Sequence, residues 1–351
     1  MSTEYPKVIL EVLSWNKWEY LLRLLESVYQ ISYPNFDVIV VDNASTDGSI
    51  QKIKEWAEGQ IPVGGKFFNY DPSAKPSSCI EYTEVEAETG GRTEKENANL
   101  QTNKRLILIK NEGNYGTSRG RNVGLRYALN VLKPDYVMLL DNDIYVDTSF
   151  LDELVSVAIQ RPDAGMLGPK IYEYENLTKL WSIGGRINYW TFSFFEHDRL
   201  AKAVEGQDIV TVDYLPLSCV LIPSRVLLTV GLLDEVFFWS SEGLDLSIRL
   251  AKYGFQLLAI TKSKVWHDLV RPLGYKERIA DIQTYVWWKN RLILYRKHWR
   301  GLQFASVIFF FLLIQVKSAF QFILFSRNLN HLKLYFKGLG EYLKWRRGWR
   351  P

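Results

Sequence analysis

The chain has 351 residues, which is enough for one large α/β domain plus an appendage. Two cysteines, Cys79 and Cys219, exclude a disulfide framework and favour a reducing compartment. The net charge of +4 is unevenly spread, because Lys289–Pro351 holds 13 Lys and Arg residues against one acid, Glu341. A mildly acidic body joined to a basic tail predicts that the tail meets an anionic surface.

The N-terminal stretch alternates apolar strands with amphipathic helices. We expect strands at Val8–Leu13 and Phe36–Val41, with a helix at Lys17–Gln30 between them. A polar turn, Asp42–Gly48, follows the second strand and leads into a helix that ends near Ala57. Continuously apolar strands that alternate with helices indicate an α/β fold with a mostly parallel, Rossmann-like sheet and helices on both faces.

Residues 60–104 interrupt this pattern and are rich in Gly, Pro, Ser, Glu and Lys. We expect an insertion here, forming a surface lobe with a short hairpin of Lys66–Tyr70 and Ile80–Glu84. Loops of this length in compact domains are usually functional or disordered, and the sequence does not decide between the two.

The alternation resumes at Leu106–Lys110. The further expected elements are a helix at Arg119–Leu132, a strand at Tyr136–Leu140, a helix at Phe150–Gln160 capped by Thr148, strands at Ala164–Ile171, Leu215–Ile222 and Phe255–Trp266, and helices at Arg225–Val230 and Ser241–Tyr253. The aromatic stretch Trp181–Tyr214 either lines a cleft or packs as ordinary antiparallel strands, and we favour packing.

Asp141-Asn142-Asp143 directly follows one of the expected buried strands. Ligands bind at the carboxyl ends of strands in open α/β sheets, and there the chain can bend both carboxylates toward one ligand. Mg²⁺ typically takes one or two carboxylates together with phosphate oxygens. The motif therefore indicates a metal–phosphate site, with a polar surface turn as the alternative.

Several motifs follow one another in a distinctive order: Ser14-Trp15-Asn16, Val40–Gly48, Asn114–Asn122, Asp141-Asn142-Asp143, Gly231–Glu235, Glu242–Leu246 and His267. Together they resemble the nonprocessive, rhamnosyltransferase-like branch of glycosyltransferase family 2, over about residues 8–298. The resemblance implies a GT-A fold, with residues 1–280 as the catalytic domain. No Gln-x-x-Arg-Trp motif occurs, which argues against a processive synthase.

The resemblance also implies roles for single residues. The residues that it places on the nucleotide-sugar donor are Asn16, Asp42, Gly116, Arg121 and Asp141. Asp42 would read the imide N–H of uracil or thymine, Gly116 would let the backbone approach the nucleotide, and Arg121 would be a cation on the donor side. Asp143 and His267 would hold Mg²⁺ or Mn²⁺.

The catalytic base is less clear from the sequence. The family usually has Glu-Asp-x-Asp at this place, and its second position, commonly the base, is Gly243 here. Glu242 and Asp245 are therefore the candidates, with Glu242 first, because residues three apart on a helix share one pocket. Helix N-terminal acids that only stabilise the dipole are the alternative.

The implied reaction is inverting transfer of a sugar from a UDP-, dTDP- or GDP-sugar to a hydroxyl of a lipid-linked or surface-glycan acceptor. Two other functions stay open. Gly243 is compatible with a catalytically silent nucleotide-sugar binder, and the acceptor atom could be a lipid phosphate, as in dolichyl-phosphate-sugar synthases.

Residues 281–351 combine basic and apolar residues. Phe304–Phe325 is long enough to span a bilayer, yet Lys317 would lie near its middle and both flanks are basic. We therefore expect helices that lie in the interface at the cytoplasmic face of an anionic membrane, or a shallow hairpin, rather than a single span. A nucleic-acid-binding tail is disfavoured, because such an arm has no use for a long apolar run. The first 30 residues lack a signal peptide, so we expect the body in the cytoplasm.

Overall fold

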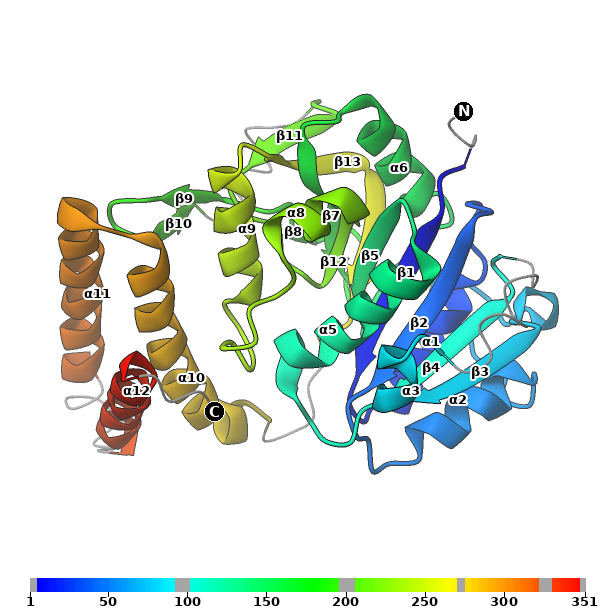
Figure 1. Cartoon of the computed structure of the whole chain (residues 1–351), viewed down its shortest axis with the longest axis horizontal. Coiled ribbons are helices and arrows are strands. Elements are labelled where there is room, and N and C mark those ends of the chain that lie inside the picture. Colours follow the sequence, from blue (N-terminus) through cyan, green and yellow to red (C-terminus); the bar gives the residue numbers. More distant parts are fainter. Residues whose placement is uncertain (1–4, 92–101, 196–205, 270–274, 322–329, 348–351) are drawn as a thin grey trace.

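The computed structural model describes residues 5–91, 102–195, 206–269, 275–321 and 330–347 (Figure 1). Its centre is a mixed sheet: among the described strands, five pairings are parallel and five are antiparallel, so the sheet is less parallel than predicted. The strand order is β11 (Ile209–Val212), β13 (Gln256–His267), β7 (Ala164–Glu173), β12 (Cys219–Pro223), β5 (Tyr136–Asp141), β1 (Val8–Ser14), β2 (Phe36–Asp42), β4 (Arg105–Lys110) and β3 (Ser78–Thr83). Two short strands, β6 (Ile144–Val146) and β8 (Leu180–Ser182), pair with β13 and β7. The predicted α/β architecture is confirmed.

Helices cover both faces of the sheet. One face packs against α1 (Trp18–Val28), α2 (Ser49–Ala57) and α6 (Phe150–Gln160). The other packs against α3 (Glu84–Glu88), α5 (Gly116–Tyr127), α8 (Ser224–Val230) and α9 (Glu242–Lys252). Alternation along β1 explains the two layers, since Leu10 joins the first core and Ile9 the second.

The carboxyl ends of three central strands meet at one edge. Ser14 at the end of β1 is level with Asp42 at the end of β2, and Leu13 is level with Asp141 at the end of β5. Parallel pairing therefore brings the predicted donor residues of separate motifs to the same edge of the sheet.

The expected hairpin within residues 60–104 is wrong. Most of its second segment lies in β3, which pairs in parallel with β4 and extends the main sheet at its edge, and the last residue, Glu84, begins α3. This segment joins the main sheet because Ile80 and Tyr82 point to the same face of β3 and pack there with α5 and α3. Residues 92–101 of the insertion lie outside the described residues.

Three helices form a group at the end of the molecule beyond α9 (Figure 1): α10 (Tyr275–His298), α11 (Gly301–Gln321) and α12 (Asn330–Arg346). They share an apolar core with the hairpin of β9 (Arg186–Asn188) and β10 (Ser193–Phe195). The expected domain boundary at residue 280 falls inside α10. Among the described helices, none is both long and apolar enough to cross a membrane. Residues 322–325 of the apolar run lie outside the described residues.

Candidate active site

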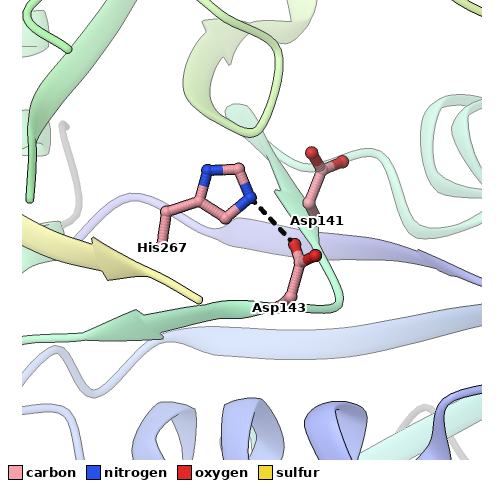
Figure 2. Close-up of side chains that lie close together, drawn as sticks. All are labelled: Asp141, Asp143 and His267. Atoms are coloured by element: carbon pink, nitrogen blue, oxygen red, sulfur yellow. Dashed lines mark hydrogen bonds and ion pairs between the residues drawn. The ribbon is translucent and has the colours of Figure 1, made fainter. Parts of the chain in front are cut away.

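Asp141, Asp143 and His267 come together beyond the end of β5. The turn at Asn142 reverses the chain into β6, which pairs antiparallel with β13 and sets Ile144 level with His267. One ligand atom from each of the three side chains lies within 4.8 Å of the others. Figure 2 shows the imidazole directed at Asp143 with Asp141 beside it. The structure thus assembles the two predicted metal ligands and adds Asp141 to them.

The environment of this cluster suits a divalent cation. His267 Nε2 lies 3.1 Å from Asp143 Oδ1, and both side chains are largely buried. Burial disfavours the Asp143 carboxylate, but the hydrogen bond and charge of His267 and the charge of Lys17 leave its pKa below the usual value. Two carboxylates and an imidazole leave coordination positions open for phosphate oxygens, as Mg²⁺ and Mn²⁺ sites require.

Arg121 has a different place from the predicted one. Its side chain is fully buried and pairs with Glu11 on β1 and with Asp141, whose Oδ1 lies 2.6 Å away. It also donates to the carbonyl oxygen of Leu140 at 3.0 Å. The prediction of a donor-side cation is therefore corrected: Arg121 orients Asp141 from beneath the site.

Glu11 was missed as a site residue. It is completely buried in β1, and burial raises its pKa to about 7, outweighing the lowering effect of Arg121. Its Oε1 has no hydrogen-bond partner within the described chain. A lone acid inside the apolar run of β1 is the signal that could have identified it, since an unpaired charge is rarely buried.

The β1–α1 and β2–α2 loops are joined above the sheet edge. The Asn16 amide donates to Ser45 Oγ at 2.7 Å, and Asn16 Oδ1 accepts from the Thr46 amide at 2.9 Å. Asn16 and Lys17 both have left-handed backbone angles, which non-glycine residues rarely adopt. This turn brings the Lys17 ammonium to 3.8 Å from Asp143 Oδ2, a second contact that the sequence did not reveal.

Asp42 presents an oxygen that the described residues leave unpaired. Its Oδ2 accepts from the Ser45 amide at 3.0 Å, while its buried Oδ1 has no partner among them. Burial raises the pKa of Asp42 above its ordinary value. A buried acceptor without a donor is costly, so a ligand N–H in that position would stabilise the loop.

Gly116 is required for a protein contact. Its φ is +70°, and a Cβ there would lie 2.1 Å from the carbonyl oxygen of Phe238. The neighbouring Thr117 amide donates to the same oxygen at 2.6 Å. In this structure the glycine lets the 236–241 loop, rather than a nucleotide, approach the start of α5, so its predicted nucleotide contact stays a prediction.

The two candidate bases occupy different environments. Asp245 accepts from Arg249 at 2.8 Å and from Lys297 and His298 of α10 at 2.5 and 2.8 Å. Although burial acts in the opposite direction, the hydrogen bond with His298 and the charges of Lys297 and Arg249 hold the pKa of Asp245 well below its usual range. With both oxygens occupied, Asp245 ties α9 to α10, and its role as a base is not supported.

Glu242 has the properties of a proton acceptor. Its carboxyl is buried, and Oε2 has no hydrogen-bond partner in the described residues. Burial raises its pKa to about 7, with the charge of Asp141 adding to the effect and that of Arg121 opposing it. A carboxyl with this pKa can take a proton near neutral pH. The loop ahead of it is held by Asn290 of α10, which donates to the carbonyl oxygens of Trp239 and Ser240.

A side chain at Gly243 would crowd a buried neighbour. A Cβ at this position would lie 3.0 Å from Leu217 Cγ, and Leu217 is itself buried. A carboxylate there would be forced against an apolar side chain. The departure from the family pattern therefore leaves Glu242, which is close enough to feel the charge of Asp141, as the remaining candidate base.

Comparison with known proteins gives the family. Residues 12–69 match the model "Glycosyl transferase family 2", and residues 94–279, just over half of the chain, match "Glycosyltransferase like family 2". The chain belongs to glycosyltransferase family 2. The resemblance inferred from the motifs is thereby confirmed.

Curated relatives match part of the chain. A low-salt glycan biosynthesis hexosyltransferase, Agl10 of Haloferax volcanii, is 24% identical over 54% of this chain and 59% of its own. An N-acetylglucosaminyl-diphospho-decaprenol L-rhamnosyltransferase of Mycobacterium tuberculosis is 26% identical over 49% of this chain and 61% of its own. The chain thus spans about six tenths of the length of these relatives.

Solved structures support the GT-A fold. The mannosyltransferase PcManGT from Pyrobaculum calidifontis, in complex with GDP-Man and Mn²⁺, superposes with a TM-score of 0.53 at 15% identity, over 88% of this chain and 69% of that one. GalNAc-T7 with UDP, GalNAc and Mn²⁺ superposes with a TM-score of 0.54 at 14% identity, over 83% of this chain and 51% of that one.

Proposed function

We propose that this family 2 protein transfers a sugar, with inversion, from a nucleoside-diphosphate sugar to a hydroxyl group. The observation that carries the proposal is the metal-type cluster of Asp141, Asp143 and His267, together with the Glu242 carboxyl, whose pKa burial raises to about 7. The same observation argues against a catalytically silent binder, because Glu242 can still act as the base although Gly243 stands where the family has an acid.

Each group has a part in the reaction. A divalent cation held by Asp143, His267 and Asp141 would neutralise charge on the departing diphosphate. Lys17 lies close enough to Asp143 to add a second positive charge there. Glu242 accepts the proton of the acceptor hydroxyl, whose oxygen attacks the anomeric carbon from the side opposite the diphosphate. Arg121 holds Asp141 in place from below.

The donor and acceptor are narrower proposals. The unpaired Oδ1 of Asp42 suits a base with a ring N–H to donate, which uracil, thymine and guanine all have, so the donor is a UDP-, dTDP- or GDP-sugar. A lipid-linked or surface glycan is the proposed acceptor, supported by the decaprenol-diphosphate relative. We place the protein at the cytoplasmic face of the cell membrane, with no nucleic-acid partner. This placement is motivated by the basic, apolar C-terminal region.

The test is release of nucleoside diphosphate from UDP-, dTDP- and GDP-sugars, with Mn²⁺ or Mg²⁺ and a membrane lipid extract. Wild type is compared with Asp143→Ala, Glu242→Gln and the matched control Asp208→Ala, an exposed acid paired with Lys262. Turnover of one donor, lost in the first two variants only, supports the proposal. Donor binding without turnover would favour a silent binder, and a product with sugar on a lipid phosphate would identify the alternative acceptor.

A further inference from the structure

The outer faces of α11 and α12 carry large apolar side chains in solvent. We call these residues the outer apolar face: Leu302, Phe309, Leu312 and Leu313 of α11, and Phe336, Leu339 and Leu343 of α12. Leu302 is 81% exposed and Phe336 71% exposed. Single exposed apolar residues are ordinary, but several of them along one side of a helix mark an interaction site.

Spacing shows that these residues form stripes. On α12, Phe336, Leu339 and Leu343 recur at i, i+3 and i+7, which places them on one side of the helix. On α11, Leu302, Phe309 and Leu313 recur at i, i+7 and i+11 and share one side in the same way. The opposite sides pack into the core, where Val307 and Phe311 are buried.

A basic stripe runs beside the apolar stripe of α12. Lys333, Lys337 and Lys344 are exposed and recur at i, i+4 and i+11, so they lie next to Phe336 and Leu343 on the helix surface. The only acid in the sequence from residue 289 onward, Glu341, pairs with Lys344 at 2.8 Å. Apolar side chains flanked by Lys and Arg are complementary to a lipid surface with anionic head groups.

We propose that the outer apolar face docks on the surface of a membrane that contains anionic lipids, with α11 and α12 lying along the interface. A second copy of the chain is the competing occupant of such a face. In such a dimer the basic stripe of one copy would approach the basic stripe of the other, and like charges across an interface oppose association. A lipid surface accommodates both stripes, because the apolar stripe enters the boundary of the acyl chains and the basic stripe meets the anionic head groups.

Docking there would connect the membrane to the site. The α10 helix packs against both outer helices and carries Asn290, which holds the loop ahead of Glu242. A membrane-borne acceptor would therefore meet a protein already oriented on its surface, a consequence that rests on the proposed transfer reaction. The docking itself does not depend on the transfer reaction, and it can be measured with a variant that lacks a metal ligand.

The experiment is co-sedimentation of the full chain with vesicles of phosphatidylcholine alone or with phosphatidylglycerol. We expect binding only to the anionic vesicles, weakened by salt. Phe336→Ser with Leu343→Ser should weaken it roughly tenfold per side chain. Lys333→Gln with Lys337→Gln should weaken it about fivefold per lysine.

Controls separate this result from misfolding and from catalysis. Leu228→Ser with Tyr253→Ser removes equally exposed apolar side chains from the catalytic body, and should bind as wild type does. Asp143→Ala should also bind as wild type, so docking and the transfer reaction fail separately. Equal binding to both vesicles, or unchanged binding by the outer-face variants, would overturn the proposal. A dimer in analytical ultracentrifugation that Phe336→Ser with Leu343→Ser dissociates would overturn it too, and would show a contact between copies.

Discussion

Asp143 Oδ1 and His267 Nε2 lie 3.1 Å apart although 124 residues separate them in the chain. The contact depends on a short reversal after β5, which lays β6 against the end of β13. A proton or a cation can occupy the space between these two atoms. The same reversal leaves Asp141 at the rim of the site, where Arg121 fixes one of its oxygens.

Glu242 and Asp245 should respond differently to removal of charge. Glu242→Gln should lower kcat by roughly 10²–10⁴-fold and leave nucleotide binding unchanged, because it removes only the proton acceptor. Asp245→Asn should lower the free energy of unfolding by about 3–5 kcal/mol, because it leaves Lys297 and Arg249 without their buried partner. Steady-state kinetics and urea unfolding measure the two effects. Loss of kcat in Asp245→Asn with loss of stability in Glu242→Gln would instead make Asp245 the base and Glu242 the structural residue.

Asp42→Asn should weaken binding of UDP or dTDP by roughly tenfold to a hundredfold, since the lost acceptor leaves the base N–H without a partner. Calorimetric titration gives the dissociation constants. The control is Asp47→Asn in the same turn, whose carboxylate accepts from Ser49 at the start of α2. Equal loss of GDP binding in Asp42→Asn would show that this carboxylate does not select a pyrimidine over guanine.

Arg121→Met should destabilise the fold by roughly 3–5 kcal/mol and reduce turnover, because Glu11 loses its counter-charge and Asp141 loses its support. Arg119→Met, two residues earlier and half exposed, is the matched control and should change stability by less than about 0.5 kcal/mol. If Arg121→Met instead has normal stability and a raised KM for the donor, the direct donor contact expected from the sequence would be supported.

Stability should fall as the pH rises from about 4.5 to about 7. Burial raises the pKa of Glu11 and Glu242 to about 7 in the folded chain, so the folded state binds more protons than the unfolded state across that interval. Each such group contributes a slope of ~1.4 kcal/mol per pH unit. Urea unfolding of the metal-free protein at several pH values tests this. Glu11→Gln should flatten the slope, and an unchanged slope would contradict the assignment.

Turns and alternation sufficed to predict most of the central strands and the helices that cover them, whereas only the family resemblance assigned Asp143 and His267 to one metal site. Parallel strands with continuously apolar runs leave few other arrangements, and the motifs mark the ends of the strands. The sequence could not show that Arg121 points inward, because that depends on Glu11 lying on the face of β1 that α5 covers. Two of the three partners of Asp245 come from α10, some 50 residues away, so only the tertiary structure separates the two candidate bases.

The most direct test is calorimetric titration of Mn²⁺, with and without the nucleoside diphosphate that the donor panel identifies. We expect Mn²⁺ to bind wild type and Asp208→Ala more tightly when the nucleotide is present. Asp143→Ala and His267→Ala should lose this nucleotide-linked binding. Unaltered Mn²⁺ binding in both variants would contradict the assignment of these two side chains as the metal ligands, and with it the account of the site.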